Sequence, residues 1–193
     1  MLKILGLLLA AGSASRFGSD KLLHPLPHGF PIAVQAARHL GAEIAPVFAV
    51  VSARSGELAA LLQAEGCEVS VCPNAEAGMG ASLAWAVRAA GEADGYLVAL
   101  ADMPFVRPSS IAAVRDALLA GAALAAPYFH ARRGHPVGIA GRFRAELEAL
   151  GGDEGARRIV AAHEAELVKI PVGDPGVIRD IDRPGDLAPP SVV

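Results

Sequence analysis

Two positively charged residues follow a stretch of small residues close to the start of the chain. An apolar run from Ile4 leads into Ala10-Ala11-Gly12-Ser13-Ala14-Ser15, and Arg16 and Lys21 come after it. Small side chains let a ligand approach the backbone, whose free N–H groups can bind an anion. A guanidinium and an ammonium both bind phosphate oxygens. The pattern indicates a polyphosphate site, and an ordinary turn with two solvated cations is the alternative.

The two commonest phosphate-binding motifs do not match this stretch. The P-loop pattern G-x-x-x-x-G-K-[ST] places a lysine directly after its second glycine, whereas Ser19 and Asp20 separate Gly18 from Lys21. The dinucleotide pattern G-x-G-x-x-G does not occur there either. A phosphate site at this position is therefore of another kind.

Carboxylates follow two later predicted strands. Asp102 comes directly after the buried run 95–101, and an acid at the carboxyl end of a central strand can hold Mg²⁺ beside a phosphate chain. An Asp that caps a turn is the alternative. The run 177–181 predicts a late strand that places Asp180 and Asp182 on one face, so that one of them could complete a metal site with Asp102. A solvated strand end explains this second pair equally well.

Three further segments carry polar groups that could contact a ligand. Residues 78–82, Gly78-Met79-Gly80-Ala81-Ser82, open a predicted helix and could lie against a nucleobase. Arg132, Arg133 and His135 share a loop that could receive an anionic second substrate. Residues 153–158 begin a predicted helix whose N–H groups and arginines could hold a phosphate. For the two segments that open a helix, an ordinary first helical turn is the alternative. For His135 the alternative is a surface or structural histidine.

Alternating strands and helices must position these residues. Strands are predicted at 1–12, 47–51, 68–72, 95–101, 122–129, 136–139, 167–172 and 177–181, with residues 132–134 able to turn a hairpin. Helices are predicted at 31–40, 55–65, 81–90, 108–119, 142–150 and 153–165. This order predicts one domain over residues 1–193, an α/β three-layer sandwich with helices on both faces of a mostly parallel, mixed sheet.

Composition limits the possible partners. The formal net charge of -3 and the pI near 6.1 argue against a general nucleic-acid binder. The two cysteines, Cys67 and Cys72, match neither a C-x-x-C redox motif nor a zinc site, which favours a reducing cytoplasm. The apolar start of the chain is short and poorly suited to a signal peptide, and no later run is long enough to span a membrane.

Taken together, these motifs resemble a known family. Residues 9–21 closely resemble the signature L-A-A-G-x-S-x-R-[MF]-G-x-x-K of the MobA-like nucleotidyltransferases, and residues 100–104 resemble their metal-binding segment. The stretches 78–83, 134–137, 152–157 and 180–184 look like the molybdenum cofactor cytidylyltransferase branch. The resemblance covers nearly the whole chain and implies a Rossmann-like fold of the nucleotide-diphospho-sugar transferase type.

The resemblance also implies roles for single residues. Arg16, Lys21 and Asp102 would be catalytic, the two cations on the triphosphate and Asp102 on Mg²⁺, with Asp182 preferred over Asp180 as second metal ligand. The nucleotide would further contact Leu9, Ala10, Ala11, Gly12, Ser15, Asn74, Gly80 and Ser82, and the acceptor would contact Arg133, His135 and Arg157.

The implied reaction moves a nucleotidyl group from a nucleoside triphosphate to an acceptor and releases pyrophosphate. Ala11 stands where guanylyl-transferring relatives tend to have glycine, which favours CTP. The acceptor would be the terminal phosphate of molybdopterin, and a molybdenum hydroxylase could receive the product. That phosphate is largely ionised at neutral pH, since its second pKa is about 6, so no catalytic base is needed. GTP, another acceptor phosphate, or a non-catalytic molybdopterin-delivery protein are the competing hypotheses.

Overall fold

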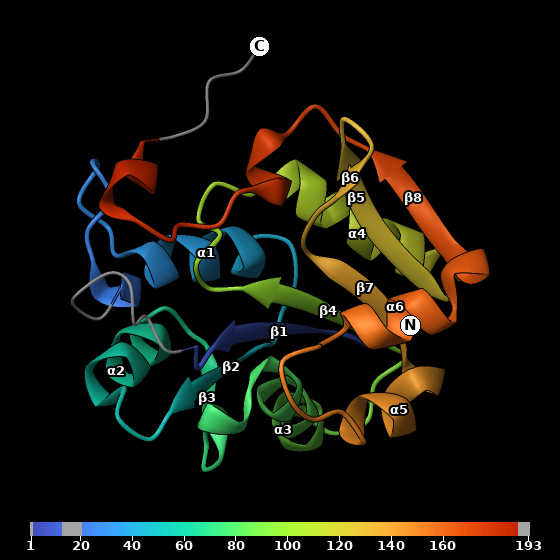
Figure 1. The fold of residues 1–193 in the computed structure, drawn as a ribbon, viewed down its shortest axis with the longest axis horizontal. Coiled ribbons are helices and arrows are strands. Elements are labelled where there is room, and N and C mark those ends of the chain that lie inside the picture. The colour runs from blue at the N-terminus through green and yellow to red at the C-terminus, as the bar shows by residue number, and fades with distance from the viewer. Residues whose placement is uncertain (1, 13–20, 189–193) are drawn as a thin grey trace.

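A sheet of eight strands runs through the middle of the molecule (Figure 1). The computed structural model describes residues 2–12 and 21–188. Along the sheet the order is β3-β2-β1-β4-β7-β5-β6, and β8 pairs with β5. The strands are β1 (Ile4–Ala10), β2 (Val47–Ser52), β3 (Glu68–Cys72), β4 (Gly95–Leu100), β5 (Leu124–Phe129), β6 (Arg132–Arg133), β7 (Val137–Ala140) and β8 (Leu167–Pro171).

The predicted mostly parallel, mixed sheet is confirmed. Strands β1, β2, β3 and β4 are mutually parallel, β7 is antiparallel to β4, and β5 is antiparallel to β7. The strand β8 runs parallel to β5. All residues of β1 are buried, as expected of a central strand covered on both faces.

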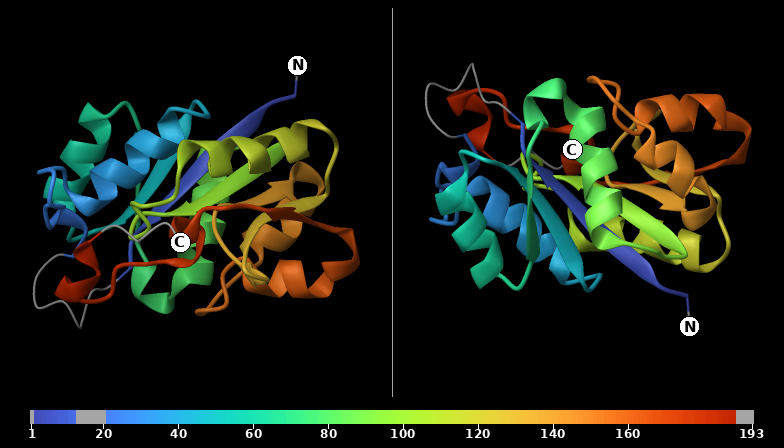
Figure 2. Two further views of the ribbon diagram at one scale, coloured as in Figure 1. Left: turned by 90° about the horizontal axis from the view of Figure 1, so that it is seen from above. Right: turned by 90° about the horizontal axis from the view of Figure 1, so that it is seen from below.

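Helices cover both faces of the sheet (Figure 2). They are α1 (Ile32–Gly41), α2 (Gly56–Ala64), α3 (Met79–Ala90), α4 (Pro108–Leu119), α5 (Arg144–Glu148) and α6 (Arg157–Ala162). The alternation along β1 sends Leu8 toward the core beneath α1, α2 and α4, and it sends Leu7 and Leu9 toward the core beneath α3, α5 and α6. The two apolar faces of the sheet thus explain the three-layer architecture.

The predicted late strand at 177–181 is wrong. A short 3₁₀ helix, Pro175–Ile178, occupies its start, because Pro175 fixes its own backbone and the Asp174 carboxylate accepts a hydrogen bond from the Gly176 N–H. The chain then continues without joining the sheet. The Ile181 N–H donates to the Asp102 carbonyl oxygen at 2.9 Å, so the segment still reaches the end of β4.

Most other boundaries agree with the prediction to within about two residues, but one helix and one turn differ more clearly. The helix expected from residue 153 begins only at Arg157, because Gly152 and Gly155 have positive φ angles that interrupt a helix. The hairpin turn lies at His130 and Ala131, which have φ angles of 46° and 62°, and residues 132–133 form the short strand β6.

Within the described part of the chain, no helix has the length and apolar composition that crossing a bilayer requires.

Candidate functional site

The carboxyl ends of three parallel strands meet at one edge of the sheet. β1 lies between β2 and β4, with Ala10 opposite Val51 and Leu9 opposite Leu100. The chain passes from β1 to β2 and β3 on one side and then returns to β4 on the other, so the order of strands reverses next to β1. Such a switch point leaves a crevice beyond the strand ends, where α/β proteins bind ligands.

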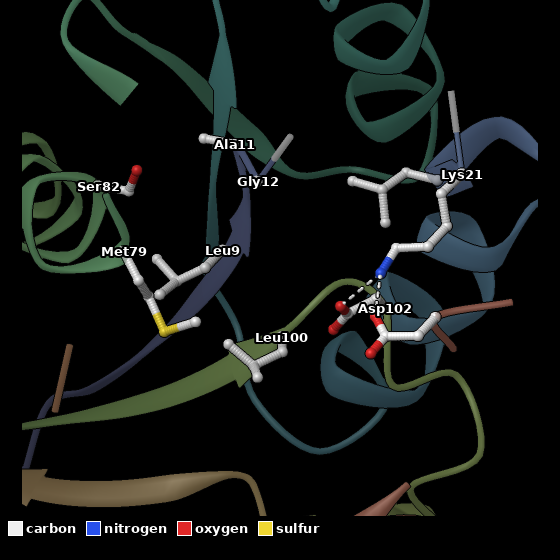
Figure 3. A pocket seen from close by; sticks show the side chains of 10 residues that line it. Leu9, Ala11, Gly12, Lys21, Met79, Ser82, Leu100 and Asp102 are labelled. Atoms are coloured by element: carbon white, nitrogen blue, oxygen red, sulfur yellow. Dashed lines mark hydrogen bonds and ion pairs between the residues drawn. The ribbon is translucent and has the colours of Figure 1, made fainter. Parts of the chain in front are cut away.

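Lys21 and Asp102 make direct contact in this crevice. The Lys21 Nζ atom lies 2.9 Å from Asp102 Oδ2 and 3.4 Å from Asp182 Oδ1 (Figure 3). Lys21 comes from a short 3₁₀ helix, Lys21–Leu23, and Asp102 follows β4. The meeting of the amino-terminal segment with Asp102, which the parallel strands led us to expect, is therefore present.

The acidic partners keep Lys21 charged. Burial lowers the pKa of the Lys21 ammonium, but the charge and hydrogen bond of Asp102, followed by those of Asp182, outweigh that effect. The pKa therefore lies above its ordinary value. The Lys21 side chain is only 11% exposed, whereas the Asp182 side chain is 53% exposed. The ammonium is held inside the crevice while Asp182 remains open to an incoming ligand.

Three carboxylates gather around the same point. Asp102, Asp180 and Asp182 each offer an oxygen, and these oxygens all lie within 4.8 Å of one another. Asp186 holds the end of this segment, since its Oδ2 atom accepts hydrogen bonds from the N–H groups of Asp182 and Arg183. These hydrogen bonds lower the pKa of Asp186. The acids meet Asp102 without the strand that was predicted to carry them.

Two adjoining hollows flank the Gly12 backbone, with volumes of about 240 and 560 Å³. Together they have the size range of a small-molecule site, about 300–1,000 Å³. Ala11, Gly12, Leu22, Met79 and Ser82 line both hollows. The smaller one also contains Leu9, Lys21, Leu100, Asp102 and Asp182, and the larger one contains Ala10, Ser52, Arg54, Ser55, Ala75, Glu76, Gly78 and Asp153.

Tight backbone packing fixes the start of α3 beside these hollows. The Gly80 N–H donates to the Gly152 carbonyl oxygen at 2.7 Å, and a Cβ atom on Gly80 would lie 2.6 Å from the Gly151 oxygen. Gly78 has a φ angle of 111° and no room for a side chain against Gly152 and Asp153. Gly80 thus uses its N–H within the protein, and Ser82, not Gly80, faces the hollows.

Among the other predicted nucleotide contacts, Asn74 lies just before two lining residues but lines neither hollow. Its Oδ1 atom accepts a hydrogen bond from the buried Cys72 thiol at 3.3 Å. Ser15 and Arg16 lie outside the described residues. The Leu9 carbonyl oxygen accepts a hydrogen bond from the Ala101 N–H, which ties the end of β1 to the segment that leads to Asp102.

The three predicted acceptor contacts, Arg133, His135 and Arg157, line neither hollow. The Nδ1 atom of His135 is buried without a hydrogen-bond partner, and the ring faces a small apolar cavity beside His39. Burial lowers the pKa of His135 to about 4. A neutral imidazole offers no positive charge to an anion at neutral pH, so only the two arginines could neutralise an acceptor phosphate. Acceptor binding by these residues stays a prediction.

Sequence reasoning missed several residues that line the hollows. Arg54, which follows β2, and Glu76, which follows β3, line the larger hollow. Met79, in contrast, belongs to the predicted stretch 78–82 and lines both hollows. The available signal was topological: β2 runs parallel to β1, so the residues after it had to reach the same edge as Gly12. In Figure 3, Met79 and Ser82 face Lys21 and Asp102 from the opposite side of the pocket.

Comparison with known proteins identifies the family. Residues 6–167 match the MobA-like NTP transferase domain. The chain belongs to this family. This MobA-like nucleotidyltransferase is 28% identical over 191 residues to the purine catabolism protein PucB of Bacillus subtilis. The alignment covers 94% of this chain and 92% of PucB.

Solved structures share the fold of this chain. The crystal structure of Rv0371c from Mycobacterium tuberculosis superposes with a TM-score of 0.82 at 25% identity, covering 96% of this chain and 95% of that one. A manganese complex of Rv0371c superposes with a TM-score of 0.79 at 22% identity, over 95% of each chain. A nucleotidyl transferase from Methanothermobacter thermautotroptrophicus gives 0.80 at 23% identity, over 95% and 94%. The nucleotidyltransferase fold predicted from the sequence is thereby confirmed.

Proposed function

We propose that this nucleotidyltransferase transfers CMP from CTP to the terminal phosphate of a molybdopterin-type acceptor and releases pyrophosphate. The observation that carries the proposal is the arrangement of Lys21, Asp102 and the Gly12 backbone around one hollow at the switch point of the sheet. A cation, a carboxylate and open backbone are the groups that bind a triphosphate together with a metal ion.

The carboxylates at this edge suit a hard divalent cation. Asp102, Asp180 and Asp182 offer oxygen ligands within 4.8 Å of one another, which is the ligand type that Mg²⁺ prefers. We propose Mg²⁺ on Asp102 and Asp182, with Asp180 as the alternative second ligand. The manganese complex of Rv0371c supports a divalent ion in this fold. When bound there, the ion would neutralise charge that develops on the reacting phosphates.

The protein's own part in the reaction is to position two polyanions and to reduce their repulsion. An oxygen of the acceptor phosphate forms a bond to the α-phosphorus, and the bond from the α-phosphorus to the bridging oxygen breaks. Pyrophosphate leaves with that electron pair. Lys21 balances negative charge on the triphosphate, and Arg16 is proposed to do the same. The acceptor phosphate arrives ionised, so the reaction needs no general base from the protein.

The base and the ribose are proposed to lie in the larger hollow, beside Ser82 and the Ala10–Gly12 backbone. The choice of CTP rests on Ala11, which takes the place of a glycine typical of guanylyl-transferring relatives. Arg54 and Glu76 also line this hollow and offer a donor and an acceptor for a base edge. Asn74 and Ser15 are proposed to complete the nucleotide contacts.

The acceptor is proposed to bind through Arg133 and Arg157, whose charges no carboxylate in the described residues neutralises as an ion pair. A molybdenum hydroxylase would then receive the product. The two free thiols, Cys67 and Cys72, support a cytoplasmic location. PucB is named for purine catabolism, and that name leaves both the nucleotide and the acceptor open.

Pyrophosphate release tests the proposal. CTP, GTP and ATP are offered with Mg²⁺ to the wild type and to Asp102→Ala, each with molybdopterin or with a sugar phosphate as acceptor. The proposal expects release with CTP and molybdopterin only, and none from the variant. Release with GTP would change the base assignment, and release with the sugar phosphate would change the acceptor. Binding of molybdopterin without any release would favour a delivery protein.

A further inference from the structure

The Lys21 ammonium lies inside the group of acids proposed to hold the metal. Its Nζ atom is 2.9 Å from one oxygen of Asp102 and 3.4 Å from one oxygen of Asp182 (Figure 3). Those two acids and Asp180 each bring an oxygen within 4.8 Å of the others. The carboxylates that contact Lys21 here are therefore also the ones that would bind a metal ion.

The ammonium has a clear electrostatic reason to be there. Three carboxylates within a few ångströms repel one another, and two of them contact the single positive charge of Lys21. The Lys21 side chain is 11% exposed, so solvent screens these contacts less than it screens a surface ion pair. Lys21 is thus a counter-ion of this cluster.

A metal ion bound to these acids would lie next to this ammonium. Mg²⁺ binds carboxylate oxygens at about 2.1 Å and would share Asp102 and Asp182 with a second cation. Two cations on the same pair of carboxylates repel strongly in a half-buried site. Movement of Lys21 away from the acids would relieve this repulsion, and its charge would then need another anion.

The triphosphate is the anion within reach. Lys21 and the Gly12 backbone line the same hollow, so a movement of the flexible lysine side chain would carry its charge from the acids toward a phosphate held beside Gly12. We propose that Lys21 and the divalent metal compete for the Asp102–Asp182 carboxylates, so that the metal binds tightly only when a nucleoside triphosphate has drawn Lys21 away. This inference rests on the proposed function and adds an order to it: the metal alone binds weakly, and metal and nucleotide strengthen each other reciprocally.

The test measures Mn²⁺ binding and needs no turnover. Free Mn²⁺ is followed by electron paramagnetic resonance in titrations of the wild type, Lys21→Met and Lys21→Gln, each with and without CTP and always without acceptor. The wild type should bind Mn²⁺ weakly alone and much more tightly with CTP. Both neutral variants should bind Mn²⁺ alone at least ~10-fold more tightly than the wild type, because the competing charge is gone. CTP should then tighten Mn²⁺ binding far less than it does in the wild type.

Lys169→Met is the matched control, because it removes the same charge from an exposed lysine of β8 that pairs with Glu164. Its Mn²⁺ affinity should equal that of the wild type. Neutral Lys21 variants that bind Mn²⁺ no more tightly than the wild type would overturn the competition, while tight Mn²⁺–CTP binding by the wild type would leave the proposed function intact. Failure of every protein to bind Mn²⁺ even with CTP would remove the metal site and the competition together. Thermal unfolding checks that each variant is folded.

Discussion

The buried histidine beside β7 makes the stability of the protein depend on pH in a way that can be calculated. The Nδ1 atom of His135 has no hydrogen-bond partner and the ring faces an apolar cavity. Burial is the main cause that lowers its pKa from 6.5 to about 4, with a hydrogen bond to the Val98 backbone and the charge of Asp180 opposing it. The charge of Arg133 acts in the same direction as burial.

The direction in which the stability changes with pH follows from proton uptake by His135. Between pH 6.5 and 4 the unfolded chain binds a proton at His135 and the folded protein does not, so the free energy of unfolding falls as the pH falls through this window. The contribution of the neutral His135 ring to the free energy of unfolding is therefore fully present above pH 6.5 and is lost as the pH falls toward 4. One pKa unit corresponds to about 1.4 kcal/mol, and integration of the two titrations gives a loss of about 2 kcal/mol between pH 7 and pH 5.

Equilibrium unfolding in urea at pH 7, 6 and 5 measures this loss. His135→Gln removes the titration and keeps a polar side chain, so the variant should lose about 2 kcal/mol less than the wild type between pH 7 and pH 5. The same exchange at the exposed His28 is the control and should leave the wild-type pH dependence in place. Equal pH dependence in the wild type and His135→Gln would refute the assignment of a buried, neutral imidazole.

Three further outcomes follow from the site. Asp102→Ala should lower turnover by at least ~10³-fold, because it removes a proposed ligand of the metal ion that would neutralise the reacting phosphates, while the melting temperature stays within a few degrees; normal turnover would remove Asp102 from the site. Lys21→Ala should raise the KM for CTP and lower kcat together, by ~10²-fold in kcat/KM, and unchanged steady-state kinetics would contradict its role. Gly80→Ala should cost about 1–3 kcal/mol in urea unfolding, because its Cβ would lie 2.6 Å from a backbone oxygen, whereas Gly151→Ala meets nothing within 4 Å and should be neutral. Equal stabilities of these two variants would contradict the packing of α3 against the 151–153 segment.

Hydrophobic pattern was enough to predict the layers and the parallel strands. The continuous apolar run of β1 is recognisable in the sequence, and so is the carboxylate that follows β4. Because β1 and β4 pair in parallel, their carboxyl ends must lie at one edge of the sheet. The meeting of Lys21 with Asp102 could thus be expected from order along the chain. The Pro108–Leu119 helix and the Glu68–Cys72 strand also have the predicted bounds, since proline and turn residues mark their ends.

Long-range contacts decided what local pattern could not. The segment around Ile181 has the alternation of a strand, but its N–H pairs with the Asp102 carbonyl oxygen and not with a sheet neighbour. His135 looks like a surface histidine in sequence, because its neighbours are arginines, yet its ring turns into an apolar cavity. Gly80 suggested an open backbone, whereas its N–H is bonded to Gly152. In each case the partner lies far away along the chain.

Label transfer in a single turnover tests the central claim, that the Lys21–Asp102 site moves a nucleotidyl group. The enzyme in excess is mixed with CTP labelled at the α-phosphate, Mg²⁺ and molybdopterin, and the label and pyrophosphate are followed together in the wild type and in Asp102→Ala. We expect that the wild type moves the label to the acceptor with one pyrophosphate released for each label moved, and that the variant leaves the label in CTP. Label that stays in CTP with the wild type, or label transfer that is equally fast in the variant, would contradict it.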